Sequence, residues 1–126
     1  AYHSMEHPAL DVQQGWTITD WEADYAQWQA AVLATLGEEL YAQAVRPFAR
    51  APYGLFNKAF LQLCANHALL PVSWSCDPLC VDGTLPMPAG RILIYHVRGD
   101  QVDSLQQLLA LGRTVLPLGD INLPAP

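Results

Sequence analysis

Two short pairs of sulfur and nitrogen side chains are the strongest candidates for chemistry in this sequence. They are Cys64 with His67 and Cys76 with Cys80, which together offer four ligands of the kind that a structural zinc site uses. Cys64 and His67 fall on the apolar face of an expected helix, however, where a free cysteine usually packs as a small hydrophobe. The chain also lacks the C-x-x-C pairs of standard zinc patterns. We therefore expect no metal and no cofactor, and keep zinc binding as an alternative.

A second candidate follows the apolar segment 91–97, where His96 and Asp100 precede an expected helix. Ligands of α/β sheets tend to bind outside the carboxyl ends of strands, and a helix N-terminus favours anions. The short connection lacks a glycine-rich phosphate loop, so we favour a capping role for Asp100. We assign no catalytic residue. A small enzyme that uses His96 and Asp100, or the cysteine pairs, stays the alternative function.

Two histidines near the start of the chain, His3 and His7, are four positions apart. On a helix this spacing would place both on one face, but Pro8 and the lack of apolar periodicity argue against a helix there. We expect an unstructured tail that needs no metal.

An acidic aromatic segment provides the leading functional hypothesis. Trp21, Tyr25 and Trp28 recur at helical spacing, and such a stripe is normally core. Tryptophan and tyrosine are also the residues enriched as interface anchors, and acidic residues flank this stripe. The expected partner-binding residues are Asp20, Trp21, Glu22, Asp24, Tyr25 and Trp28.

The charge distribution supports the same hypothesis. The net charge is −6, from 12 acidic and 6 basic residues, and residues 1–45 contain no lysine or arginine. This balance excludes nucleic acid and an anionic membrane as expected partners. We predict a non-enzymatic interaction module, such as an assembly chaperone, an inhibitor or immunity-type protein, or a small subunit, that binds a basic or amphipathic protein. Homo-oligomerisation is left open.

Three cysteines, an odd number, favour a reducing compartment, so we expect a cytoplasmic protein. With 126 residues, of which 52% are hydrophobic and 14% charged, the chain is expected to form a single domain over 1–126. Residues 1–16 are expected to form an extended arm that Trp16 anchors.

The elements that must position these residues follow from periodicity and capping. Thr19 and Glu22 form an expected capping box for a helix that Gly37 breaks or kinks before a segment ending near residue 46. Further elements are expected at 55–67 (helix), 72–75 (strand), 91–97 (strand), 101–111 (helix) and 114–118 (strand). The last three predict a βαβ crossover with a parallel strand pair. The expected fold class is α+β, with a helical N-terminal half packed on a small mixed sheet.

Overall fold

The computed structural model describes residues 1–74, 92, 106, 109–110 and 112. The chain divides into two compact units, Ala1–Ser73 and Trp74–Pro126, and almost all of the described residues belong to the first. The βαβ crossover expected over 91–118 lies outside the described residues, apart from a few isolated positions. That crossover and the single domain over 1–126 stay predictions.

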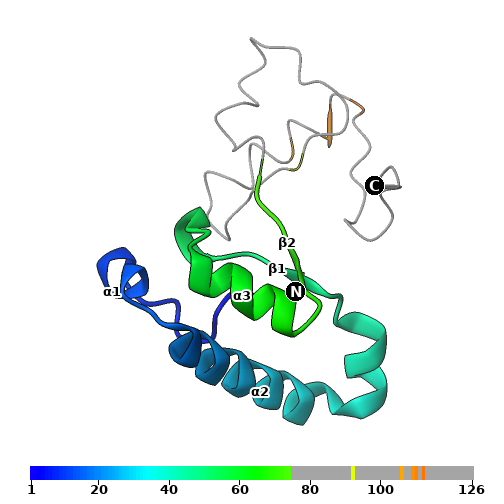
Figure 1. The fold of residues 1–126 in the computed structure, drawn as a ribbon. Coiled ribbons are helices and arrows are strands. Elements are labelled where there is room, and N and C mark those ends of the chain that lie inside the picture. The colour runs from blue at the N-terminus through cyan, green and yellow to red at the C-terminus, as the bar shows by residue number, and fades with distance from the viewer. Residues whose placement is uncertain (75–91, 93–105, 107–108, 111, 113–126) are drawn as a thin grey trace. The chain divides into compact units, whose positions relative to one another are not determined.

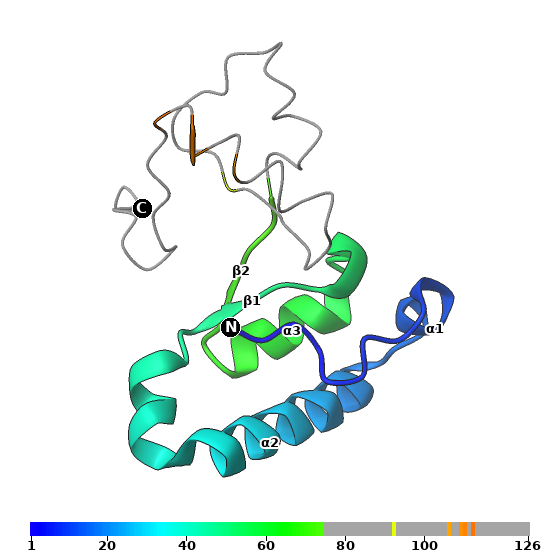
Figure 2. The same ribbon diagram turned by 180° about the vertical axis from the view of Figure 1, so that it is seen from behind.

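The first unit combines helices with a small parallel sheet, which confirms the mixture of helix and small sheet. Its elements are α1 (Leu10–Gln14), α2 (Ile18–Ala44), β1 (Phe48–Ala49), a 3-10 turn (Pro52–Gly54), α3 (Lys58–Asn66) and β2 (Leu70–Pro71). β1 and β2 pair in parallel, with Phe48 opposite Leu70 and Ala49 opposite Pro71. Figures 1 and 2 show α3 between α2 and this strand pair. The described sheet therefore lies within residues 48–71: no strand was expected at β1, and β2 ends just before the strand that was expected at 72–75.

The long helix α2 begins two residues earlier than expected. Its N-cap is Thr17, and Asp20 completes the capping box, in place of the expected Thr19 and Glu22. The Asp20 carboxylate accepts from the backbone N–H of Thr17 at 2.8 Å and from its hydroxyl at 2.7 Å. Gly37, with φ of 73° and ψ of 166°, interrupts the helical backbone, so the predicted break or kink at this glycine is confirmed. Glycine adopts this positive φ without the steric cost that a Cβ brings.

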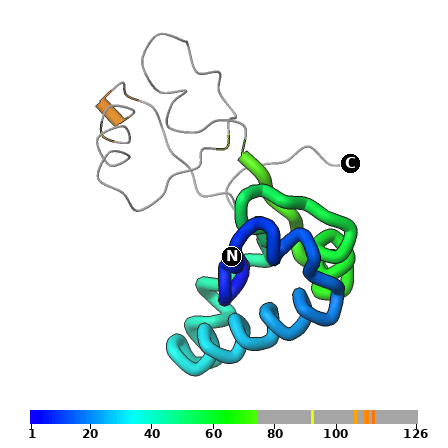
Figure 3. Tube along the Cα trace, turned by 90° about the vertical axis from the view of Figure 1, so that its left-hand side faces the viewer, coloured from blue at the N-terminus to red at the C-terminus, as the bar shows by residue number. Residues whose placement is uncertain are grey.

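The first sixteen residues are not the extended arm that was expected. They include α1, and Tyr2 is 1% exposed and pairs in parallel with Ala49 as an isolated bridge. Figure 3 shows these residues folding back over the unit before the chain enters α2. Trp16 packs edge-on against Trp21, as its expected anchoring role requires. Burial of a large aromatic ring and two backbone hydrogen bonds hold this segment in place.

Aromatic and aliphatic side chains from α2, α3 and the strands form the core of this unit. Trp21 contacts Phe60 edge-on, with ring centroids 5.0 Å apart, and α2 packs against α3 around this contact. The buried core residues are Tyr2, Trp21, Tyr25, Ala49, Ala51, Phe60, Leu63 and Cys64. In the part of the chain that the structure describes, no helix is both long enough and apolar enough to span a membrane.

Candidate functional site

Two loops leave the same edge of the parallel strands. The Tyr2 N–H donates to the Phe48 carbonyl, and the Arg50 N–H donates to the Tyr2 carbonyl, each at 2.9 Å. Because this pairing is parallel, residues 3–7 and 50–54 emerge together at the carboxyl end of their strands. This edge is where open parallel sheets tend to bind ligands. We therefore take these two loops as the candidate site.

His3 is held by two contacts with Arg50. Its Nδ1 lies 2.8 Å from the Arg50 carbonyl oxygen, and its Nε2 lies 3.1 Å from Nη2 of the guanidinium. A carbonyl can only accept and a guanidinium can only donate, so Nδ1 carries the proton and Nε2 carries the lone pair. Burial lowers the pKa of Arg50. A histidine whose Nδ1 donates to a backbone carbonyl has the orientation usual for a metal ligand bound through Nε2.

His7 completes a cluster of rings at this edge. Its ring centroid lies 5.1 Å from that of His3 and 5.0 Å from that of Tyr53. His7 is exposed and Tyr53 is 53% exposed, so both are accessible to a ligand on this unit. His7 therefore contacts both the imidazole of His3 and the phenol ring of Tyr53.

The backbone of both loops is strained. Ser4, His7 and Tyr53 have φ values of 65°, 45° and 55°, in the left-handed region that residues other than glycine rarely adopt. Such conformations cost about 1–3 kcal/mol each and persist only where surrounding contacts impose them. Strain of this kind clusters at functional sites, which supports the choice of this edge.

A buried carboxylate from α2 contacts the loop of residues 3–7, which we call the histidine loop. Asp24 is 3% exposed and accepts from the Glu6 N–H at 2.9 Å, from the Met5 N–H at 2.9 and 3.1 Å, and from the Ser4 hydroxyl at 3.1 Å. The Tyr2 hydroxyl donates to the same carboxylate. Burial, together with this hydrogen bond, raises the pKa of Tyr2.

The expected partner-binding residues do not share one surface. Trp21, Tyr25 and Asp24 are buried, at 0%, 7% and 3% exposed, so packing accounts for the first two and the histidine loop for the third. Asp20 is exposed and caps α2, while Trp28 is partly buried against the core. Glu22 contacts α3 instead: its carboxylate lies 2.6 Å from His67 Nε2 and accepts from the Asn66 amide at 2.8 Å.

The sulfur and nitrogen pairs are placed only in part. Cys64 is 2% exposed in the core, and burial raises the pKa of its thiol, whereas His67 contacts Glu22 and the ring of Tyr25. Cys76, Cys80, His96 and Asp100 lie outside the described residues. Among the residues that are described, no group of three or more potential metal ligands occurs. The alternative site of four ligands therefore stays a prediction.

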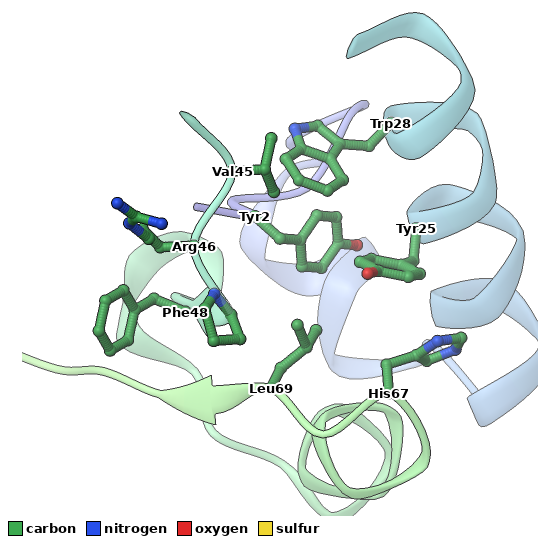
Figure 4. Close-up of a pocket in the computed structure, with 9 residues that line it drawn as sticks. Tyr2, Tyr25, Trp28, Val45, Arg46, Phe48, His67 and Leu69 are labelled. Carbon is green, nitrogen blue, oxygen red and sulfur yellow. The ribbon is translucent and has the colours of Figure 1, made fainter. Parts of the chain in front are cut away.

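An aromatic cavity of about 190 Å³ lies elsewhere on the first unit. Figure 4 shows Tyr2 beside Trp28 and Tyr25, with Val45, Arg46, Phe48, His67 and Leu69 around them. The Tyr2 ring meets Tyr25 and Trp28 edge-on, with centroids 5.1 and 5.4 Å apart. None of the lining residues belongs to the two loops of the candidate site.

Sequence reasoning noticed the spacing of His3 and His7 but placed them in an unstructured tail, which is wrong. Helical periodicity was the only pattern tested for the pair. In the structure both histidines lie in the loop that follows Tyr2, the residue that pairs with Ala49 of β1. Tyr2 directly before His3, and the turn-forming Pro52 and Gly54 after Arg50, were the available signals of two loops that follow strands.

No protein-family model and no curated protein matches the sequence. Among solved structures, the chain is similar to a family 4 carbohydrate esterase from Streptomyces lividans, determined in complex with acetate. The TM-score is 0.65 at 18% sequence identity, and the match covers 89% of this chain but only 61% of the esterase chain. The likeness shows a shared fold. Because the neighbour is an enzyme, it contradicts the expected non-enzymatic interaction module and gives no support to a chaperone or inhibitor role.

Proposed function

We propose that this chain carries the histidine-bearing part of a hydrolase that removes ester-linked acyl groups from carbohydrate. The fold likeness to a carbohydrate esterase supports the reaction class. The observation that carries the proposal is the pairing of His3 and His7 at the carboxyl edge of parallel strands, on a strained loop. The match covers 61% of the esterase chain, so the proposal is limited to the part of the site that His3 and His7 form.

The two imidazoles fit a divalent metal ion of the borderline class, such as Zn²⁺. Histidine nitrogen is a preferred zinc ligand, and a backbone carbonyl that accepts from Nδ1 leaves Nε2 of His3 as the ligating nitrogen. In this structure Nε2 accepts from Arg50 Nη2, so the guanidinium has to leave this lone pair when the ion binds. When bound, such an ion acts as a Lewis acid toward an acyl carbonyl. The pair supplies two protein ligands, and the described residues supply no third.

The remaining residues of the two loops have separate roles in this proposal. The Arg50 carbonyl holds the tautomer and the ring orientation of His3, and its guanidinium occupies Nε2 until an ion takes its place. Tyr53 presents an accessible aromatic face beside His7, against which the apolar face of a sugar ring can pack.

A zinc titration of the full chain, made without a polyhistidine tag, tests the proposal. Isothermal titration calorimetry should give one zinc ion per chain for the unaltered protein, with binding about 10-fold or more weaker in His3→Ala and in His7→Ala. His67→Ala removes a histidine that faces Glu22 and should leave zinc affinity unchanged. Acetate release from an acetylated oligosaccharide, with and without zinc, then tests the reaction itself.

Two results would contradict the proposal. Absence of zinc binding in the unaltered protein would remove the metal role of the pair. Zinc binding that survives both His3→Ala and His7→Ala but is lost in Cys76→Ser or Cys80→Ser would place the metal at the cysteine pairs instead.

A further inference from the structure

We infer that Asp24 is a positioning residue that sets the geometry of the His3 and His7 pair. This inference rests on the proposed function for the role of the pair, and on the contacts of a buried carboxylate for the role of Asp24. The aspartate is on α2, and its carboxylate binds the backbone that joins the two histidines.

The loop surrounds the Asp24 carboxylate much as a protein surrounds a bound anion. The successive N–H groups of Met5 and Glu6 both point at it, and the Ser4 and Tyr2 hydroxyls donate to it as well. Successive N–H groups next to a left-handed residue form an anion-binding concavity, and Ser4 has φ of 65°. All of these donors are neutral, so the buried carboxylate is satisfied by hydrogen bonds from the loop.

A continuous chain of hydrogen bonds leads from Asp24 to His7. The Ser4 hydroxyl donates to Asp24 at 3.1 Å and accepts from the His7 N–H at 3.0 Å. It therefore links the carboxylate to the second histidine, whose own φ is strained at 45°. At the other end of the loop, the Tyr2 hydroxyl ties the residue before His3 to the same carboxylate.

The part of α2 that carries Asp24 is packed into the core. Trp21 and Tyr25, one turn before and one residue after it on α2, are buried in the core. A carboxylate fixed in this way can impose strained loop conformations that the loop sequence alone would not adopt. Removing its charge should leave the core packed but change the positions of the two imidazoles relative to each other.

The test is Asp24→Asn, with Asp20→Asn as the matched control on the same helix. An asparagine has the same shape but presents an NH₂ group toward N–H and O–H donors, so it cannot accept all of the loop's hydrogen bonds. Zinc should bind about 10- to 100-fold more weakly, the usual effect of losing an outer-shell partner. Asp20→Asn alters the exposed cap of α2 and should change zinc affinity less than about 2-fold.

A spectroscopic measurement separates positioning from a general loss of stability. With Co²⁺ in place of Zn²⁺ and at saturating concentration, the visible spectrum reports ligand geometry rather than the folded fraction. It should change in Asp24→Asn and stay unchanged in Asp20→Asn. If Asp24→Asn does not fold, Ser4→Ala tests the same chain of hydrogen bonds at a partly exposed side chain, and should show weaker zinc binding and an altered cobalt spectrum.

Failure of the inference is distinguishable from failure of the proposed function. Unaltered zinc affinity and an unaltered cobalt spectrum in folded Asp24→Asn would overturn the positioning role while leaving the metal site intact. If the unaltered protein binds neither ion, the proposed function fails, and amide hydrogen exchange decides the inference. Faster exchange at Met5 and Glu6 in Asp24→Asn, relative to Asp20→Asn, would support it, and unchanged exchange would overturn it.

Discussion

Replacing Trp21 tests both the core of the first unit and the chemistry of one buried N–H. The side chain is 0% exposed and lies edge-on between Trp16 and Phe60, with centroid distances of 4.7 and 5.0 Å. Its indole Nε1 is buried without a hydrogen-bond partner among the described residues. Two substitutions separate these features, because Trp21→Ala removes the ring system and Trp21→Phe keeps a six-membered ring but removes the N–H.

The two variants should differ widely in the free energy of unfolding. Truncation of a buried tryptophan to alanine costs about 3–5 kcal/mol. The smaller phenylalanine loses roughly 1–3 kcal/mol of packing, but it also relieves the roughly 1–3 kcal/mol penalty of an unsatisfied buried donor. Trp21→Phe should therefore lie within about 1 kcal/mol of the unaltered protein, because the two effects oppose each other.

Urea unfolding followed by far-ultraviolet circular dichroism measures both values, and constant slopes show that the unfolded states are comparable. Trp16→Phe is the control for losing an indole at a partly buried position of the same cluster. If Trp21→Phe destabilises as much as Trp21→Ala, the N–H is hydrogen-bonded in solution and the argument about the unsatisfied donor is wrong. A cost below about 1 kcal/mol for Trp21→Ala would show that the ring is not in the core.

Three further predictions concern the rest of this unit. Gly37→Ala should destabilise by about 1–3 kcal/mol in thermal unfolding, because no atom lies within 4 Å of the new Cβ and the cost comes from a backbone conformation that essentially only glycine adopts. Hydrogen bonds from His67 and Asn66 lower the pKa of Glu22 from 4.5. The contribution of Glu22 to the free energy of unfolding is therefore fully present above pH 4.5 and is lost as the pH falls through the pKa of the folded state. In urea titrations, the free energy of unfolding of Glu22→Gln should fall less on acidification than that of the unaltered protein, by under about 1 kcal/mol at this partly exposed site. An equal fall in both proteins would contradict the assignment. Cys64, whose thiol pKa is raised by burial, should be alkylated only after unfolding, as peptide mapping by mass spectrometry can show.

The positions of the acidic residues of α2 also argue against the expected interaction surface. An interaction surface needs exposed carboxylates, whereas Asp24 is buried beneath the histidine loop and Glu22 contacts α3. Asp20 caps a helix. Each carboxylate of the expected surface thus has a partner within the first unit.

Local patterns in the sequence were sufficient for α2 and α3, but not for α1, which lies within the expected extended arm. The kink at Gly37, the end of α2 before Pro47 and the helix within 55–67 follow from backbone preferences and apolar periodicity. The cap of α2 was misplaced by two residues because Thr17–Asp20 and Thr19–Glu22 both match the capping-box pattern. The cap of α3 by Asn57, which accepts from the Phe60 N–H at 2.8 Å, was present in the sequence and was not used.

Only the tertiary structure brought the candidate site together. Tyr2 pairs with Ala49, Arg50 holds His3, and Asp24 binds a loop some twenty positions before it in the chain. None of these contacts leaves a periodic signal, because each depends on where a distant segment packs once the core has formed. Periodicity and capping report interactions within about one helical turn, so the sequence determined α2 and α3, whereas packing across the chain decided how His3 and His7 are held.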